Sequence, residues 1–477
     1  MNLPESFTSS IEKLLGADEA EQLFKSLETS APVSVRLNTS KIKRYGLAFA
    51  SEKREAIPWC SNAYYLSERP TFTFDPLFHG GAYYVQEASS MFIAHILEQH
   101  LDKTKPVLAL DLCAAPGGKS SLLRGFLPEG SLLVANEIVS KRAQILSENI
   151  LKWGHPDVLV TNNSAVDFEK TPLSFDVVLA DVPCSGEGMF RKDEAAIEEW
   201  SPQNVEVCWQ RQREIVSSIW QNLKPGGLLI YSTCTFNSKE NEENVQWIID
   251  TLGAESLAVT TDSNWNISPA LQGFEQYSYR FLPHKTKGEG FFVAALRKPL
   301  SDGQQAPACT KSKKKKKKKL TAQAAIHQRL FQPAKDWVSV DDSYDLLIED
   351  ETCFVFRKQY FAVLDVLKQY KFHLIHAGTP LAYLKGKSCL PHPALAFSAL
   401  YKETAFSQVE LSYEQAISYL RKEAIALAAT TSKGFVLLTY KQLPLGFVKH
   451  LGNRSNNLYP APWRIRSSYL PDEIKTL

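Results

Sequence analysis

The chain is organised around apolar runs that alternate with amphipathic segments, most regularly between residues 106 and 299. Between these runs, apolar residues three and four positions apart predict helices, as in the face of Val139, Ala143, Leu146 and Ile150 that precedes Gly154. Alternating strands and helices of this length predict a doubly wound, mostly parallel α/β sheet. The runs that predict its strands cover residues 107–112, 132–137, 158–160, 175–181 and 228–232.

The segments around these strands follow from the same periodicities. A long helix is expected from about Pro202 to Leu223, and Asn237, with Glu240 three residues later, is expected to cap the helix that follows it. The first hundred residues are expected to form an accessory α+β segment. Further strands are expected at 33–38, 277–282 and 291–296.

Composition divides the 477 residues into parts of different character. At about 100–200 residues per domain, this length predicts roughly three domains. Segment 300–325 has almost no residues able to build a core and contains the seven lysines Lys313–Lys319, so we expect a linker there. The expected parts are an accessory segment at 1–100, an α/β domain at 101–299, the linker at 300–325, an α+β subdomain at 326–405 and a C-terminal module at 406–477.

Charge and cysteine usage restrict the partners and the chemistry. The formal net charge is +2, and without the seven lysines it is 2 − 7 = −5, so any basic surface must be local. The sequence has no secretory signal and no uncharged apolar run long enough to span a bilayer, so we expect a cytoplasmic protein without a membrane partner. The eight cysteines include no C-x-x-C pair, which argues against a metal site or a disulfide framework and predicts working thiols.

A glycine-containing turn joins the first strand of the α/β region to its helix. It reads D-L-C-A-A-P-G-G-K-S from Asp111 to Ser120. A phosphate-binding P-loop nearly fits, but the position of its first glycine is Cys113, and the dinucleotide fingerprint G-x-G-x-x-G is absent. The remaining interpretation is a pocket for S-adenosyl-L-methionine, which carries a ribose and an adenine but no phosphate.

Acidic residues at two other strand ends favour this last interpretation. Glu137 ends the second strand, where a carboxylate can accept hydrogen bonds from both ribose hydroxyls. Asp181 ends the fourth strand, which in doubly wound sheets commonly lies beside the first. We therefore expect Asp111 and Asp181 on the two sides of one crevice.

Two cysteines follow the ends of the fourth and fifth strands. Cys184 and Cys234 both lie in loops rich in Gly, Ser and Thr, and neighbouring strands are about 4.8 Å apart, so both thiols can reach one pocket. A buried cysteine is more often a small apolar residue. Beside a methyl donor, however, one thiolate can add to C6 of a cytosine and make C5 nucleophilic, while the other thiol assists proton removal or release. Asp181 can stabilise the adduct at the N3 and amino edge of the ring.

These motifs carry a family resemblance. The segments D-L-C-A-A-P-G-G-K-S, A-N-E, D-V-P-C-S-G-E-G-M-F-R-K-D and Y-S-T-C-T-F-N-S-K-E-N-E resemble those of the Nop/Sun family of RNA cytosine-5 methyltransferases. V-Q-E-A-S-S-M at 85–91 and R-L-N at 36–38 match as well. The similarity is strongest to the RsmF-like bacterial branch, which modifies 16S ribosomal RNA, and it extends more weakly to the C-terminus.

The resemblance implies a role for individual residues. It implies that Cys234 attacks C6 and that Cys184 assists release. Two positions depart from the family pattern: Val182 replaces the usual alanine, and Ser164 stands where an acid near the adenine is typical, so Asp167 or a backbone amide is an alternative contact. The cofactor-binding residues that it implies, with Arg142 as a weaker candidate, are Cys113, Ala114, Ala115, Pro116, Gly117, Gly118, Lys119, Glu137, Arg142, Ser164 and Asp181.

The C-terminal segment 441–477 is locally basic, with six Lys or Arg against Asp472 and Glu473. The interleaved aromatic residues Phe447, Tyr459, Trp463 and Tyr469 are expected to stack on bases, although a basic surface over a small core fits the composition equally well. G-F-V-K-H-L-G-N-R-S-N-N-L-Y-P resembles the PUA-like module of RsmF-type enzymes, which favours RNA. The lysine tract is expected to add salt-sensitive affinity.

The sequence therefore predicts a monomeric RNA cytosine-5 methyltransferase that uses S-adenosyl-L-methionine and acts on ribosomal RNA or the small ribosomal subunit. The target base would have to leave its stack to reach Cys234. Three alternatives stay open: a tRNA substrate, a non-catalytic RNA-binding ribosome assembly factor, and an ATPase, which the missing P-loop glycine disfavours.

Overall fold

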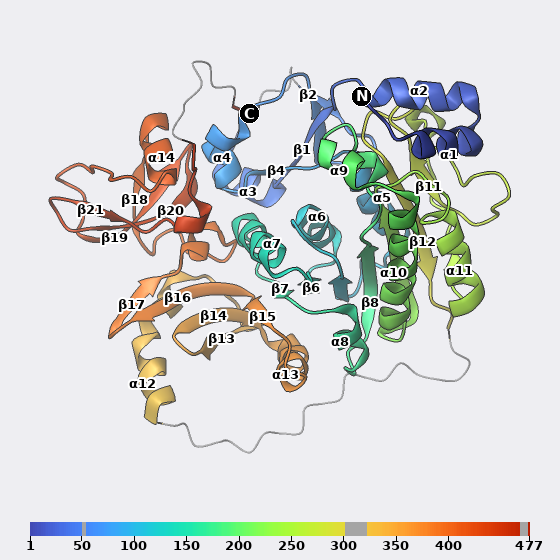
Figure 1. Ribbon diagram of the computed structural model, residues 1–477. Coiled ribbons are helices and arrows are strands. Elements are labelled where there is room, and N and C mark those ends of the chain that lie inside the picture. Colours follow the sequence, from blue (N-terminus) through green and yellow to red (C-terminus); the bar gives the residue numbers. More distant parts are fainter. Residues whose placement is uncertain (50–53, 301–321, 468–475) are drawn as a thin grey trace.

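The computed structural model describes residues 1–49, 54–300, 322–467 and 476–477 (Figure 1). The lysine tract 313–319 and most of the predicted linker lie outside the described residues, and helix α12 (Ala322–Leu330) begins within the last residues of that linker. Among the described residues, no helix combines the length and the apolar character needed to cross a membrane.

A large sheet occupies the centre of the molecule, with the strand order β10-β12-β9-β8-β5-β6-β7-β15 (Figure 1). The five strands from β9 to β7 are parallel. At the two sides of this group, β12 pairs with β9 and β15 pairs with β7, both antiparallel. This arrangement confirms the predicted doubly wound α/β fold. The strands are β5 (Leu108–Asp111), β6 (Leu132–Asn136), β7 (Val158–Thr161), β8 (Phe175–Asp181), β9 (Leu223–Thr233), β10 (Glu255–Ser256), β11 (Tyr279–Phe281) and β12 (Phe291–Arg297), with β11 paired to β12.

Helices bury both faces of this sheet. Because successive side chains of a strand point to opposite faces, Ala109 belongs to one hydrophobic cluster and its neighbour Leu110 to the other. The first cluster includes residues of α5, α6 and α7, and the second includes residues of α8, α10 and α11. These helices are α5 (Phe92–His100), α6 (Gly118–Phe126), α7 (Ser140–Trp153), α8 (Ala165–Glu169), α10 (Pro202–Trp220) and α11 (Glu242–Leu252), and the short α9 (Glu194–Glu199) precedes α10.

Two predicted boundaries differ from the structure. Helix α10 ends at Trp220, and β9 begins at Leu223 because this residue pairs with Phe175 at the start of β8. Asn237 does not cap α11, which begins at Glu242. Instead, Asn237 Oδ1 accepts a hydrogen bond from the Glu240 backbone N–H (2.9 Å) within the preceding turn.

The N-terminal part contacts the loop that follows β8. The centroid of the Phe7 ring lies 5.0 Å from that of Phe190 and 5.5 Å from that of Trp200. The first two helices therefore cover the segment just after Cys184. A four-stranded antiparallel sheet, β2-β3-β1-β4, completes this part. Its elements are α1 (Glu5–Leu15), α2 (Ala17–Leu27), β1 (Val33–Leu37), α3 (Thr39–Tyr45), β2 (Arg54–Ala56), β3 (Ala63–Leu66), α4 (Pro76–His79) and β4 (Tyr83–Val85).

The C-terminal part holds two further four-stranded sheets, joined by one hydrophobic cluster (Figure 1). One strand leaves this part, because Leu374 of β15 pairs with Thr161 of β7 and so extends the central sheet. The subdomain expected at 326–405 is therefore physically continuous with the α/β domain. The elements are β13 (Tyr344–Glu349), β14 (Thr352–Arg357), α13 (Phe361–Gln369), β15 (Leu374–Ala377), β16 (Thr379–Lys385), β17 (Ser388–Pro391), β18 (Ser407–Glu410), α14 (Tyr413–Leu420), β19 (Gly434–Tyr440), β20 (Leu443–His450) and β21 (Ser455–Asn457).

The structure corrects the expected role of two C-terminal aromatic residues. Phe447 and Tyr459 are each only 1 % exposed, and they pack in the core of the C-terminal part against Phe406 and Tyr419 respectively, so they offer no face to a base. Trp463 is partly exposed, and Tyr469 lies outside the described residues. The basic side chains Lys441, Arg454, Arg464 and Arg466 are exposed, as expected for phosphate contacts.

Candidate active site at the carboxyl ends of the central strands

The predicted site residues lie at one end of the central sheet. Asp111 ends β5, Asp181 ends β8, and Glu137 follows β6 directly. Because β5 lies between β6 and β8, the loops after these strands face one another. β9 pairs with β8, with Asp181 opposite Ser232, so the loop that carries Cys234 leaves the sheet next to the loop that carries Cys184.

The turn from Cys113 to Lys119 is fixed by close contacts. The Ala114 N–H donates to the Asn136 carbonyl (2.8 Å), which joins the loops after β5 and β6. Gly117 adopts a φ of 112°, and a Cβ atom there would lie 3.2 Å from Leu146 Cδ1, so only glycine fits without strain. Arg36, from the predicted R-L-N motif, donates to the Gly118 carbonyl (3.2 Å).

Carboxylates dominate the electrostatics of this turn. Burial raises the pKa of Asp111 to about 7, opposed by the hydrogen bond from Ser120 (2.6 Å) and reinforced by Asp181 and Glu137. Lys119 Nζ lies 2.9 Å from Asp181 Oδ2. Burial lowers the pKa of Lys119, but the ion pair with Asp181 outweighs burial and leaves that pKa raised. Lys119 therefore stays charged and is held by a carboxylate.

Cys113 lies in the same turn, and its thiol stays protonated. Burial, with the charges of Asp111, Asp181 and Glu137, raises its pKa above the usual range. Because the thiolate is the nucleophilic form of cysteine, Cys113 is unsuited to nucleophilic attack. Its place in the turn fits the sequence prediction that it lines a cofactor pocket.

Glu137 and Arg142 lie together at the end of β6. Glu137 Oε1 accepts from the Val139 N–H (2.9 Å), and Glu137 Oε2 lies 3.7 Å from an Arg142 guanidinium nitrogen. Arg142 also donates to the Ala115 carbonyl (3.0 Å). Arg142 thus spans the second strand end and the glycine-containing turn, which places this weaker sequence candidate in the site.

Ser164 has a structural partner. Its hydroxyl donates to Asp167 Oδ2 (2.9 Å), which also accepts from the Ser164 N–H (3.1 Å) at the start of α8. The Ser164 hydroxyl and the Asp167 carboxylate, the two side chains considered for the adenine contact, are therefore hydrogen-bonded to each other. A contact of either with the adenine stays a prediction.

This set of groups suits S-adenosyl-L-methionine better than a nucleoside triphosphate. The carboxylates of Glu137 and Asp181 stand at these strand ends, and carboxylates attract a sulfonium cation and repel a polyphosphate. Glu137 is the carboxylate that the sequence predicts to accept from the ribose hydroxyls, and the Gly117–Gly118 turn lets a ligand approach the backbone. Lys119, the phosphate-binding residue of a P-loop, is instead paired with Asp181. The donor set fits the methyl donor.

The two cysteine thiols are in direct contact. Cys184 Sγ lies 3.1 Å from Cys234 Sγ, and the Cys234 N–H donates to Cys184 Sγ (3.3 Å). The hydrogen bond with Cys234 and burial together raise the pKa of Cys184 well above its usual range. Cys184 therefore holds its proton, and its S–H lies within hydrogen-bond distance of the Cys234 sulfur.

A buried carboxylate from the Cys234 side holds the Cys184 loop. Glu240 Oε2 accepts from the Ser185 N–H (3.0 Å) and from Gln212 Nε2 (2.7 Å), and Glu240 Oε1 accepts from Asn237 Nδ2 (2.8 Å). The Ser185 hydroxyl contacts both Glu240 and the Thr235 hydroxyl. Glu240 is fully buried, so these bonds are shielded from water.

A second buried carboxylate makes the reciprocal connection. Glu187, from the Cys184 loop, accepts from the backbone N–H groups of Phe236 (2.7 Å) and Asn237 (2.9 Å), and from Trp200 Nε1 (3.0 Å). We call Glu187, Glu240 and the groups that they bind the carboxylate clasp. Sequence reasoning missed it, although two acids within a few residues of the two cysteines were a usable signal.

No metal centre accompanies this site: among the residues that the structure describes, no group of three or more His, Cys, Asp or Glu side chains is placed to hold an ion.

The chain is similar to known families along most of its length. Residues 95–297 match a family model described as 16S rRNA methyltransferase RsmB/F. Residues 3–88 match the N-terminal domain of 16S rRNA methyltransferase RsmF, and residues 406–465 match the methyltransferase RsmF PUA domain.

Curated relatives and solved structures agree with these matches. The ribosomal RNA small subunit methyltransferase F of Shewanella sp. (strain W3-18-1) is 30% identical, covering 93% of both chains, and that of Cronobacter sakazakii is 29% identical, covering 96% of this chain and 95% of the relative. A crystal structure of a methyltransferase homolog protein from Pyrococcus horikoshii is 27% identical over 62% of this chain and 95% of that chain, with a TM-score of 0.53. NSun6 from Pyrococcus horikoshii with SFG shares the fold at 21% identity, with a TM-score of 0.52 over 62% of this chain and 99% of that chain.

Proposed function

Because this chain belongs to the RsmF family of small-subunit ribosomal RNA methyltransferases, we propose that it methylates C5 of a cytosine in 16S ribosomal RNA, with S-adenosyl-L-methionine as the methyl donor. The observation that carries the cytosine-5 assignment is the 3.1 Å contact between the Cys184 and Cys234 thiols beside the Lys119–Asp181 ion pair. Methylation at a base nitrogen or a ribose oxygen, which are already nucleophilic, needs no thiol addition.

Cys234 is the proposed nucleophile. Its thiol loses a proton to solvent, and the thiolate adds to C6 of the target cytosine, so that the electrons of the C5–C6 double bond make C5 nucleophilic. The bound S-adenosyl-L-methionine supplies the methyl group that C5 takes. Before attack, the S–H of Cys184 lies 3.1 Å from the Cys234 sulfur and can donate a hydrogen bond to it.

Cys184 is proposed to complete the reaction. The C5 proton passes to Cys184 as its own S–H proton passes to the departing Cys234 sulfur, the C6–S bond breaks, and the C5–C6 double bond forms again. Both cysteines end as thiols, so the pair is ready for another turnover. The high pKa of Cys184 suits this role, because a weakly acidic thiol is a strong base once it has given up its proton.

The remaining site residues are proposed to bind and orient. Asp181 is held by Lys119 and by the Ser232 hydroxyl, which donates to Asp181 Oδ1 (2.7 Å). This leaves the carboxylate beside the cysteines, where it can face the N3 and amino edge of the cytosine. Glu137 accepts from the ribose hydroxyls, and the backbone of 113–118 lines the pocket, with Arg142 closing its edge.

The RNA substrate is proposed from the family and from the exposed basic C-terminal residues. Sequencing of bisulfite-treated 16S ribosomal RNA and total tRNA, from cells with and without the gene, tests this assignment. We expect one cytosine in 16S RNA to resist bisulfite conversion in the wild-type strain and to be converted in the deletion strain. A lost signal in tRNA alone, or an unchanged pattern in both RNAs, would contradict the proposal.

A further inference from the structure

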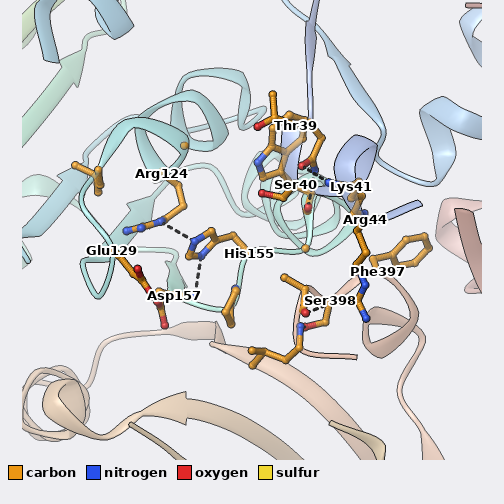
Figure 2. Close-up of a pocket in the computed structure, with 18 of the residues that line it drawn as sticks. Thr39, Ser40, Lys41, Arg44, Arg124, Glu129, His155, Asp157, Phe397 and Ser398 are labelled. Atoms are coloured by element: carbon orange, nitrogen blue, oxygen red, sulfur yellow. Dashed lines mark hydrogen bonds between the residues drawn. The ribbon is translucent and has the colours of Figure 1, made fainter. Parts of the chain in front are cut away.

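A cavity of about 440 Å³ lies where the three parts of the chain meet (Figure 2). The N-terminal part contributes α3, the central domain contributes the loops before β6 and β7, and the C-terminal part contributes residues 397–400. In Figure 2, Arg124, His155 and Asp157 lie on one side of it and Ser40 and Lys41 on the other. Loops that precede parallel strands lie at the opposite end of the sheet from loops that follow them. The loops on its wall therefore lie at the opposite end of the sheet from those of Cys184 and Cys234, while the Arg36 guanidinium reaches the Gly118 carbonyl of the turn after β5.

Three buried cations on the wall of this cavity bind only uncharged acceptors. Arg36 donates to Gln86, Ser121 and the Gly118 carbonyl, and Lys41 Nζ donates to the carbonyls of Gly80 (2.7 Å) and Lys152 (2.5 Å).

Arg124 donates to the carbonyls of Ser131 (2.8 Å) and Pro128 (3.1 Å) and to His155 Nε2 (3.2 Å). None of the three cations is within ion-pair distance of a described carboxylate. Elsewhere, the buried Arg280 is paired with Glu242. Arg357, which also lines this cavity and is half-buried, is paired with Asp157.

Burial without an anionic partner disfavours the charged state of these side chains. Burial lowers the pKa of Lys41 well below its ordinary value and lowers that of Arg36 to about 10. Burial also lowers the pKa of Arg124, although the charge of Asp157, which is not within ion-pair distance, partly opposes this. An anion in the cavity would relieve this cost, because it would compensate charges that carbonyl oxygens satisfy only partly.

Asp157, a residue of the cavity wall, carries an unused hydrogen-bond acceptor. Asp157 is 2 % exposed, and its Oδ2 atom accepts from Arg357 (2.9 Å) and from the Tyr344 hydroxyl (3.2 Å). Asp157 Oδ1 is buried and has no hydrogen-bond partner among the described residues. A buried carboxylate oxygen without a donor is costly, so a ligand here should bring a hydroxyl or amino group as well as negative charge.

We propose that this cavity, which we call the junction pocket, binds a ribonucleotide unit. Its phosphate would face the cations Arg36, Lys41 and Arg124, and a ribose hydroxyl would donate to Asp157 Oδ1. The unit can belong to a bound RNA chain or be a free nucleotide, since both present the same phosphate and sugar. All three parts of the chain line the junction pocket, so its occupancy would tie their relative positions together.

Calorimetry on the full chain, saturated with S-adenosylhomocysteine, tests the proposal with 5′-CMP as the probe and cytidine as the uncharged comparison. The Arg124→Gln variant removes a cation of the junction pocket. Arg297→Gln is its matched control, because Arg297 likewise donates to two backbone carbonyls, those of Gly226 (2.9 Å) and His100 (3.1 Å). Ser40→Glu adds negative charge from an exposed position on the pocket wall, and Ser217→Glu, on the surface of α10, is its control.

We expect 5′-CMP to bind at least tenfold more tightly than cytidine, and Arg124→Gln and Ser40→Glu each to weaken it at least about tenfold while both controls bind as wild type. If a short oligoribonucleotide displaces 5′-CMP, the natural ligand is RNA; if it does not, the ligand is a free nucleotide. Binding that is absent, or that Arg124→Gln and Ser40→Glu leave unchanged, overturns the proposal. Methyl transfer by the cysteines does not enter these measurements, so either result leaves the proposed reaction to its own test.

Discussion

Glu187 and Glu240 each hold the loop to which the other belongs. Glu187, on the Cys184 loop, binds backbone N–H groups that follow Cys234, and Glu240, after Cys234, binds the Ser185 N–H next to Cys184. Asn237 Nδ2 joins the two carboxylates, at 3.1 Å from Glu187 Oε1 and 2.8 Å from Glu240 Oε1. The 3.1 Å contact between the thiols therefore depends on a network that neither loop could build alone.

We expect Glu240→Gln to lower kcat for methyl transfer about tenfold or more, with little change in the affinity for S-adenosyl-L-methionine. All the groups around this carboxylate are donors, so a glutamine amide would face another donor and displace the Ser185 loop. Steady-state kinetics on a 16S RNA fragment checks this. Glu206→Gln, an α10 carboxylate bound by Lys239 and Gln210, is the matched control and should retain wild-type kcat. Equal kcat values in the two variants would contradict the role of the carboxylate clasp in positioning the cysteine loops.

The two cysteine substitutions are expected to fail at different steps. Cys234→Ala should abolish methyl transfer, because no thiol remains to add to C6. Cys184→Ala should methylate once and then accumulate an RNA–protein adduct, visible as a retarded band on a denaturing gel, because release is impaired. Cys208→Ala, a buried cysteine of α10, should form no stable adduct and keep its activity. Turnover by Cys234→Ala at the wild-type rate would refute its role as nucleophile.

Glu137→Gln is expected to weaken S-adenosyl-L-methionine binding about tenfold or more, measured by calorimetry without RNA. A hydrogen bond to a charged acceptor is worth about 1.5–3 kcal/mol, and glutamine offers the ribose hydroxyls an uncharged acceptor. Glu148→Gln removes a carboxylate of α7 that binds Lys152 and serves as the control. Unaltered affinity in Glu137→Gln would show that the ribose lies elsewhere.

The buried Asp111 predicts a pH-dependent stability difference. Its pKa is about 7 in the folded protein and about 4 when unfolded, so the folded state holds the extra proton between these values and stability falls as pH rises through this window. Asp111→Asn can keep the Ser120 hydrogen bond without ionising. Relative to wild type, this variant should gain ~2–3 kcal/mol of unfolding free energy between pH 5 and pH 8.

Denaturant unfolding at the two pH values measures this gain. Asp250→Asn, at an exposed position of α11, controls for loss of one acid. If the difference in unfolding free energy between Asp111→Asn and wild type is the same at pH 5 and pH 8, Asp111 is ionised throughout this range.

Local pattern determined much of this protein. The alternating strands and helices, the acids at the ends of β5, β6 and β8, and the two cysteines after β8 and β9 all follow from residues close together in sequence. Side-chain periodicity and strand-end position are local properties, and parallel strands bring their carboxyl ends to one edge. The sequence therefore predicted which residues lie together at one end of the central sheet.

Only the tertiary structure decided how those residues are held. The clasp joins groups about fifty residues apart, and which carboxylate meets which amide depends on the packing of two loops rather than on either pattern. The same holds for Phe447 and Tyr459, whose burial in the C-terminal core excludes the stacking role expected for them among the basic residues. Burial and pairing depend on the neighbours that the fold supplies, and a linear pattern does not contain them.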